Sequence, residues 1–356
     1  MLSGSFCGRS IGAHFRRIIE EYEHRAGFWS GSRIAEIEIR GRKSALAGTV
    51  TRRMLLGGGV VAGAAGLGLY RMFPKFFWQE LADDMKRGVL PAVKVPDPGH
   101  WPDTGLHAAW LGHSTVLMKV DGFTILTDPV LHDRVGIDAW VATLGIKRLV
   151  APALKVGKLP KVDLILSSHA HMDHLDRATM RELEHKTTEV VMAKATSDLI
   201  RPNRYKRVTE LGWTETLKVG PATVRGLEVK HWGARMRTDT YRGYNGYGLE
   251  VGRWKILFGG DTADTDAFRA QRNGGADLAL MPIGAYNPWI FAHCNPEQAW
   301  RMANEYGAEH VMGIHHKTFK LSSEPYGEPL ERLLAAAGNS ESRVVVREIG
   351  SEVHLS

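Results

Sequence analysis

Short apolar runs alternate with helical stretches from about residue 105 to the end of the chain. The runs are rich in β-branched and large apolar residues and are bounded by Gly, Pro, Asn and Asp, which is typical of strands. They cover residues 108–120, 124–128, 162–168, 190–193, 223–230, 247–251, 255–258, 278–282 and 311–315. Apolar positions at helical spacing predict helices at 177–184, 263–272, 296–306 and 328–337. This alternation predicts a layered α/β domain over residues 105–356.

The residues before this domain divide into three segments. Residues 1–50 are basic, and we expect a disordered or cytoplasmic tail there. Residues 51–73 hold Arg52-Arg53 followed by a Gly/Ala-rich apolar run from Met54 to Tyr70, which resembles a twin-arginine export signal. Such a signal normally begins near the N-terminus, so a later translation start is an alternative. Residues 74–104 contain several prolines, which prevent helix propagation, and are expected to form a linker.

The predicted signal would direct the chain through the twin-arginine export machinery. The apolar run is slightly shorter than the about 20 residues that span a bilayer, and no clear A-x-A cleavage site follows it. A cleaved signal and an uncleaved membrane anchor are therefore alternatives, and a helix packed on the domain is a third. The first two predict a protein in the periplasm or anchored to the outer face of the bacterial inner membrane.

Composition narrows the classes of function. The hydrophobic share of 44% and the charged share of 24% fit a domain that folds in water. The formal net charge is +7, and the first 53 residues carry ten Arg and Lys against five Glu, so only +2 remains for the rest. No nucleic-acid partner is expected, because that would need a basic excess around the site. With only Cys7 and Cys294, a cysteine-based zinc site cannot form, so any metal must be held by His and carboxylates.

Four candidate metal ligands fall within six residues after the predicted strand at 162–168: His169, His171, Asp173 and His174. His169 and His171 lie two residues apart and can point the same way, while Asp173 and His174 can curl to an adjacent position. Without a cation, such a cluster would lack a group to neutralise and orient its side chains. The motif therefore predicts a loop that supplies ligands to two metals.

The pattern H-x-H-x-D-H resembles the signature of the metallo-β-lactamase superfamily. His231, Asp261 and His315 follow in the family's order, each at the end of a predicted strand, so two stacked sheets could bring them to one edge. The resemblance implies a four-layer αββα sandwich with two divalent ions, for which zinc suits the ligands best and manganese or iron are alternatives. It implies His169, His171 and His231 on one metal, Asp173, His174 and His315 on the other, and Asp261 bridging, with His316 as an alternative to His315.

Five further segments resemble the branch that contains N-acylphosphatidylethanolamine-hydrolysing phospholipase D and its bacterial relatives. They are residues 110–115, 127–129, 283–286, 293–297 and 315–319. The branch implies that a metal-bridging hydroxide attacks a phosphodiester, and it implies a small-molecule or phospholipid-like substrate. The expected apolar pocket walls and the export signal favour membrane association. Relatives commonly have Trp-Gly where this chain has His316-Lys317, so the pocket wall there departs from the pattern.

Two other functions fit the same ligands. A lactone or carboxylic ester hydrolase similar to ascorbate-6-phosphate lactonase would use the same metals with a different pocket. A non-catalytic metal-binding domain would use them for binding alone, although the complete ligand set argues against it.

Other side chains have expected roles beside the metals. Asp173 is expected to orient or deprotonate the attacking water, and Asp128 to hold the metal loop through hydrogen bonds. His113 and His293 are candidates for substrate contact or leaving-group protonation. The expected substrate-binding side chains are Tyr286, Trp289, Phe291, Arg235 and His316, with Arg237 beside Arg235. Ordinary packing is the alternative for the aromatic residues, and a solvated loop is the alternative for the arginines.

Overall fold

The computed structural model describes residue 84 and residues 86–139, 142–236 and 238–356, which belong to a compact unit spanning Gly68–Ser356. The expected tail at 1–50 and the expected export signal or anchor at 51–73 lie outside the described residues, as does Arg237. Within the described ranges, no helix is both long enough and apolar enough to cross a membrane.

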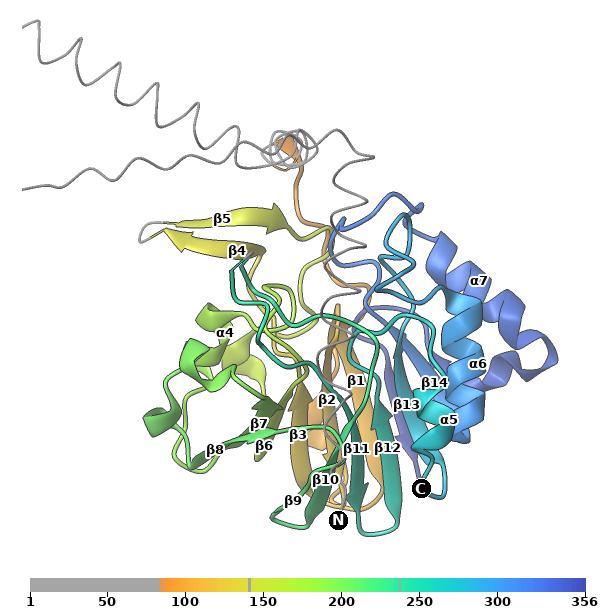
Figure 1. The fold of residues 1–356 in the computed structure, drawn as a ribbon, viewed down its shortest axis with the longest axis horizontal. Helices are drawn as coiled ribbons and strands as arrows, with labels where there is room; N and C mark the ends of the chain where they lie inside the picture. The colour runs from red at the N-terminus through yellow and green to blue at the C-terminus, as the bar shows by residue number, and fades with distance from the viewer. Residues whose placement is uncertain (1–83, 85, 140–141, 237) are drawn as a thin grey trace, which may run out of the picture. The chain divides into compact units, whose positions relative to one another are not determined.

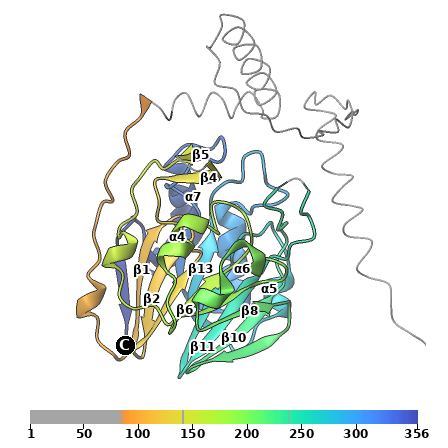
Figure 2. The same ribbon diagram turned by 90° about the vertical axis from the view of Figure 1, so that its left-hand side faces the viewer.

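Two seven-stranded mixed sheets pack face to face (Figures 1 and 2). The first has the order β16 (Glu352–Leu355), β1 (Leu106–Gly112), β2 (Thr115–Val120), β3 (Phe123–Thr127), β6 (Leu164–Ser167), β7 (Glu189–Ala193) and β8 (Arg207–Leu211). The second has the order β15 (Val344–Val346), β14 (Ala308–Ile314), β13 (Ala276–Pro282), β12 (Trp254–Phe258), β11 (Gly246–Val251), β10 (Ala222–Leu227) and β9 (Thr216–Val219). A separate hairpin consists of β4 (Arg134–Ala139) and β5 (Ala142–Lys147).

Helices cover the outer faces of the two sheets. On the second sheet lie α5 (Ala267–Ala270), α6 (Pro296–Tyr306) and α7 (Glu328–Ala337), and α4 (Arg177–Glu182) packs on the first sheet (Figure 1). Short 3-10 segments occur at Pro98–His100, Val156–Lys158, Ser197–Leu199, Pro202–Arg204 and Gly338–Arg343. The arrangement is the expected four-layer αββα sandwich.

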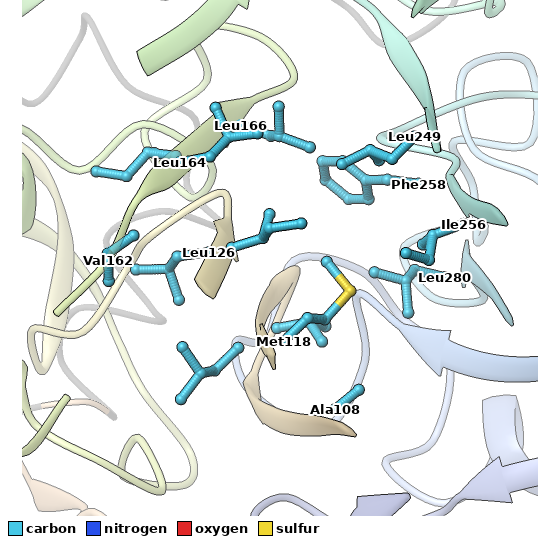
Figure 3. Close-up of a cluster of buried hydrophobic side chains, with 14 of the residues drawn as sticks. Ala108, Met118, Leu126, Val162, Leu164, Leu166, Leu249, Ile256, Phe258 and Leu280 are labelled. Atoms are coloured by element: carbon cyan, nitrogen blue, oxygen red, sulfur yellow. The ribbon is translucent and has the colours of Figure 1, made fainter. Parts of the chain in front are cut away.

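The central strands of the second sheet are apolar on both faces because each face meets another layer. Ile256 and Phe258 of β12 point into the core between the sheets, where Leu280 of β13 joins them (Figure 3). Leu257 and Met281 alternate with these residues and pack against the helices. Side chains alternate between the faces of a strand, so each strand contributes to two cores.

Several elements differ from the sequence expectation. The run at 108–120 is two strands, because Gly112 (φ 120°) and His113 (φ 52°) form a tight turn between β1 and β2. The helix expected at 263–272 is confined to α5, since the Thr265 hydroxyl accepts a hydrogen bond from Ala267 N and so competes with helical bonding. Strands β4, β5, β8, β9, β15 and β16 lie outside the predicted runs. Of these, β8 and β9 are half-exposed and carry polar residues that weaken an apolar pattern.

Part of the expected linker runs along the domain. Leu90 N donates to Leu149 O at 2.9 Å, and Lys94 N donates to Ile349 O at 3.3 Å. Trp101 is buried, and its indole N–H donates to Glu352 at 3.2 Å. Residues 90–101 therefore form a strap that is hydrogen-bonded to the segment after β5 and to strand β16.

Parallel strands of both sheets deliver their following loops to one edge of the sandwich. In the first sheet β3 and β6 are parallel, and in the second β12, β13 and β14 are parallel. Asp128, Ile283 and His315 directly follow their strands, and His169 and Asp261 come two and three residues after the ends of β6 and β12. The loops that carry the candidate ligands thus begin side by side.

Candidate metal centre

The loop after β6 folds into a tight turn. His174 N and Leu175 N donate to His171 O at 3.1 and 2.9 Å, which turns Asp173 and His174 back toward the strand end. Arg235 fastens the turn from outside, because its Nη1 donates to Ala170 O at 3.0 Å and to Leu175 O at 2.8 Å.

One group of candidate ligands joins this loop to the second sheet. His169, His171, His231 and Asp261 each offer an atom within 4.8 Å of the others. His171 Nδ1 lies 2.8 Å from His169 Nε2 and 3.3 Å from His231 Nε2. These are the three imidazoles that the resemblance implies for one metal.

A second group lies on the other side of Asp261. It contains Asp173, His174 and His315, the ligands implied for the other metal, together with His113. Asp261 Oδ2 lies 3.0 Å from His315 Nε2 and 3.1 Å from His174 Nε2, and it lies 3.9 Å from His169 Nε2 in the first group. Asp261 is therefore placed between the groups, where a bridging carboxylate would be.

The donor atoms fit a pair of divalent cations. His174 Nε2, His315 Nε2 and both oxygens of Asp261 are buried and have no hydrogen-bond partner among the described residues, although they lie close together. Buried polar atoms are ordinarily hydrogen-bonded, so atoms that converge without hydrogen-bond geometry indicate a ligand between them. Imidazole and carboxylate donors without thiolate suit zinc, manganese or iron.

In two of the ligand rings, His174 and His231, the other nitrogen is fixed by a hydrogen bond. Asp128 Oδ2 accepts from His174 Nδ1 at 2.6 Å and from the Ser168 hydroxyl at 2.5 Å, and Oδ1 accepts from Ser168 N at 2.7 Å. His231 Nδ1 lies 2.9 Å from Ala292 O, to which it donates. These bonds leave Nε2 of His174 and His231 directed at the centre, as outer partners of metal ligands commonly do.

Without a metal, the ionisable side chains of the centre shift one another's pKa values. Burial disfavours ionisation of Asp173 and Asp261, yet attraction to His174 holds the pKa of both carboxyls well below the ordinary value. Burial disfavours protonation of His315, but attraction to the Asp261 carboxylate raises its pKa to about 9. By contrast, burial lowers the pKa of His171 to about 4, which keeps its nitrogen available as a ligand.

Three residues of the metal centre have strained backbone. His113, Asp128 and His315 have φ values of 52°, 30° and 63°, in a region that costs non-glycine residues about 1–3 kcal/mol each. Such strain persists where the surrounding structure holds a side chain in a required direction. Here all three residues carry groups that converge on the centre.

His113 and His293 lie closer to the ligands than sequence alone suggested. His113 is buried, and its Nε2 lies 2.9 Å from Asp173 Oδ2. His293 Nδ1 lies 3.7 Å from Asp261 Oδ2, and the two form a third group with His315. Both imidazoles line the centre itself, and their roles in substrate contact or proton transfer stay predictions.

The expected substrate-binding residues have varied surroundings. The Tyr286 hydroxyl is 2.7 Å from Glu328 Oε1, and the Tyr286 ring packs under Arg332. Trp289 and Phe291 form a half-buried edge-to-face pair with centroids 6.1 Å apart. His316 is buried and stacks on the Trp110 ring, with centroids 4.6 Å apart.

The sequence assigned no individual role to three further residues at the centre. The half-buried Trp232 ring lies 4.4 Å from His231 and 4.7 Å from His171 between centroids. The Thr318 hydroxyl accepts from His113 N at 2.6 Å, and Phe319 meets the His113 ring edge-on at 5.2 Å. Trp232 and Phe319 each lie within four residues of a candidate ligand, and Thr318 and Phe319 also lie in the segment 315–319 that resembles the phospholipase branch.

Comparison with known proteins agrees with this geometry. A family model described as the beta-lactamase superfamily domain matches residues 124–316. An uncharacterised Mycobacterium tuberculosis protein is 34% identical over 257 residues, which covers 70% of this chain and 68% of that protein. N-acyl-phosphatidylethanolamine-hydrolyzing phospholipase D 1 of Caenorhabditis elegans is 31% identical over 263 residues, which covers 68% of this chain and 73% of the worm protein.

The fold is also found among solved structures. The isothiocyanate hydrolase from Delia radicum gut bacteria matches with a TM-score of 0.57 and 17% identity, over 70% of this chain and 99% of that chain. The ligand order, the four-layer sandwich and these relatives lead to one conclusion: the chain belongs to the metallo-β-lactamase superfamily and carries the residues of a metal-dependent hydrolase.

Proposed function

We propose that this protein is a binuclear metal-dependent phosphodiesterase that acts on a phospholipid-like substrate. The observation that carries the proposal is the pair of ligand groups on either side of Asp261. The worm relative, whose name describes hydrolysis of an N-acylated phospholipid, supports the choice of a phosphodiester. Zinc is the proposed metal because the ligands are imidazoles and carboxylates in a site without thiolate.

Divalent cations bound here would lower the pKa of coordinated water and neutralise charge on a phosphoryl oxygen. The chain's own residues hold that centre in place. Asp128 orients His174, Ala292 orients His231, and His113 holds the Asp173 carboxylate through its Nε2. Because these partners are buried, the ligand geometry is set before substrate arrives.

The substrate would enter from the side of the half-buried aromatic residues. Trp232 lies over two ligand imidazoles, and Trp289 and Phe291 lie on the loop that ends at His293. Flat apolar side chains of this kind suit acyl chains or other apolar groups near the phosphodiester. We propose that His293 and His113 contact the substrate oxygens.

The test is a substrate panel on protein whose bound metal has been quantified. We expect turnover of bis(4-nitrophenyl) phosphate and of N-acylphosphatidylethanolamine, and near-background rates for His231→Ala and Asp261→Asn. Turnover of lactones without phosphodiesters would replace this proposal with the lactone or ester hydrolase. No turnover of either class by the metal-replete protein would leave the non-catalytic metal-binding function.

We further propose that the chain is exported and retained at the outer face of the inner membrane by residues 51–73. The paired arginines before an apolar run support this location. Cell fractionation with and without a working twin-arginine system tests it. Equal recovery of the protein in the cytoplasm of both strains would contradict it.

A further inference from the structure

Arg148 carries a buried positive charge close to the centre, although it is not a candidate ligand. It directly follows β5 and is fully buried. None of the described carboxylates forms an ion pair with it, and burial lowers the pKa of its guanidinium to about 10 against the attraction of Asp133 and Asp176. The group therefore keeps its charge at neutral pH. Burying a charge costs free energy unless its N–H groups are hydrogen-bonded, so the contacts of Arg148 indicate what it holds in place.

The guanidinium and the backbone of Arg148 hold the loop that follows β3. Nε donates to His132 O at 3.0 Å, and Nη2 donates to Val130 O. The backbone N of Arg148 donates to Asp133 O at 2.9 Å. One residue thus binds three carbonyls of the loop that begins with Asp128.

The flat face of the guanidinium supports a second segment. It lies over the Phe319 ring, 5.1 Å from the centroid, and that ring meets the His113 ring edge-on at 5.2 Å between centroids. Beside it, Leu149 N donates to Thr318 O at 2.7 Å, and the Thr318 hydroxyl accepts from His113 N at 2.6 Å. Arg148 and its neighbour therefore fix His113 through both its ring and its backbone.

Gly112 leaves room for the guanidinium in the turn before His113. Its φ is 120°, and a Cβ there would lie 3.1 Å from Arg148 Nη1 and 3.4 Å from Thr318 Oγ1. A larger residue would be strained and would press on both groups. The glycine in this turn therefore allows the close approach of the buried arginine.

Both sets of contacts lead to the same ligand group. Asp128 Oδ2 accepts from His174 Nδ1 at 2.6 Å, and His113 Nε2 lies 2.9 Å from Asp173 Oδ2. His174 and Asp173 belong to the ligand group that contains His315. Arg148 is thus one residue away from the outer partners of two of the three ligands implied for that ion.

The ligand group that contains His231 depends less on these contacts. His231 Nδ1 donates to Ala292 O at 2.9 Å. Asp128 reaches His169 by way of the Ser168 hydroxyl, which lies 2.9 Å from His169 Nδ1, so this link is one contact longer than the link to the other group.

We propose that Arg148 is a positioning residue of the metal centre, which sets the affinity for the ion held by Asp173, His174 and His315. This inference rests on the two-ion centre of the proposed function and is independent of the substrate that the centre cleaves. Lysine at position 148 would keep the charge, but a point charge on a flexible stem cannot replace a planar fork that holds two carbonyls and an aromatic face.

Titration of the full-length protein with zinc against a chromophoric chelator tests the inference. The parent should bind two ions, and Arg148→Lys should bind one with parental affinity and the other about 10–100-fold more weakly, the usual effect of disturbing an outer partner. The matched control is Arg343→Lys, because the half-buried Arg343 makes the same kinds of contact elsewhere: its Nε donates to Glu309 O at 2.9 Å, and its guanidinium lies 4.8 Å from the Trp300 centroid. This control should bind both ions as the parent does.

Combination with ligand variants identifies the ion that Arg148 affects. In a His231→Ala background the remaining ion belongs to the His315 group, and Arg148→Lys should weaken it by the same 10–100-fold. In a His315→Ala background the remaining ion should be unaffected by Arg148→Lys. Equal losses in the two backgrounds, or the reverse pattern, would overturn the inference.

Phe319→Leu is a milder second variant, since it removes the ring beneath the guanidinium and leaves the fork in place. It should weaken the same ion by a smaller factor. Preferential weakening of the His231 group's ion by this variant would also overturn the inference.

Amide hydrogen exchange of the full-length protein in chelator tests the positioning without any metal. Arg148→Lys should speed exchange several-fold in peptides that cover residues 128–133 and 315–319, and should leave β9 and β10 at the parental rate. Parental exchange in both loops would contradict the role of Arg148. Neither readout uses hydrolysis, so a protein that cleaves no phosphodiester but shows these changes would separate failure of the proposed function from failure of this inference.

Discussion

At the residue scale, Asp128 orients the metal loop and His174, although it is not one of the implied ligands. It is fully buried, and both of its oxygens are occupied by Ser168 and His174. A carboxylate can accept all three hydrogen bonds, whereas an amide must turn its NH₂ toward one of the donors. Its φ of 30° is tolerated by Asn as well as Asp, so this exchange changes the chemistry more than the backbone.

Asp128→Asn is therefore expected to weaken metal binding by about 10–100-fold, the usual effect of losing an outer partner of a ligand. Competition with a chromophoric chelator measures the affinity. Asp103→Asn, at an exposed carboxylate paired with Lys119, is the matched control and should bind metal as the parent does. An Asp128→Asn protein with parental affinity would show that the ligand rings are held by other contacts.

The contacts of Arg235 favour one of two roles that the sequence could not separate. Its Nη1 holds two carbonyls of the metal loop, whereas the sequence suggested either a phosphate contact or a solvated loop. Arg235→Met should lower the bound metal per chain and the turnover number together, since the loop loses both bonds. Arg253→Met, at an exposed turn, serves as control. Full metal content with a raised KM for phosphodiesters would instead support the phosphate contact.

The sequence predicted the ligand loop because four donors lie within six residues and no long-range information is needed to see them. Contacts that close only in three dimensions could not be predicted. Thr318 accepts from His113 across 205 positions, and Arg235 reaches Ala170 across 65. Nothing in the sequence distinguishes Trp232 from other aromatic residues, and only its distances to the His171 and His231 rings place it at the centre.

At the scale of elements, α6 links the site loop to the fold. Its N-cap is Asn295, two residues after His293, and the cap is reciprocal: Asn295 Oδ1 accepts from Gln298 N at 2.9 Å, and Gln298 Oε1 accepts from Asn295 N at 3.0 Å. The cap therefore fixes where the loop ends and the helix begins.

Asn295→Ala should lower the free energy of unfolding by about 1 kcal/mol, while Asn295→Asp should keep most of it because Asp caps equally well. Urea denaturation followed by circular dichroism measures both. Equal losses for the two variants would mean that the Asn295 side chain stabilises the protein by some contact other than the cap.

How well the sequence predicted a strand depended on how that strand is packed in the fold. Strands β12 and β13 are buried on both faces, so their apolar runs were visible in the sequence. The edge strand β9 alternates exposed and half-buried positions and gave no run to detect. The hairpin was missed for a related reason, because Gly136 and Gly145 pair across it and interrupt its apolar pattern.

At the scale of the whole molecule, the centre joins the two sheets through ligands from both. His169 and His174 follow the first sheet, and His231, Asp261 and His315 follow the second. Bound metal would thus cross-link the sandwich, and its removal would leave buried donors without partners.

Chelation should accordingly lower the Tm by roughly 5–10 °C when metal had been present at about 100 times its Kd. Differential scanning calorimetry with and without chelator measures the shift, and adding metal back should reverse it. His171→Ala, which removes one ligand, should show a smaller chelator effect. An identical Tm for metal-loaded and chelated protein would contradict the cross-linking of the sheets.

The central claim is that seven side chains hold two divalent ions between the sheets. Elemental analysis of purified protein dialysed against trace zinc tests it most directly. The account predicts about two ions per chain, and about one in each of His231→Ala and His315→Ala, because these residues belong to different ligand groups. A parent protein that retains no ion, or a single ion lost equally in both variants, would contradict it.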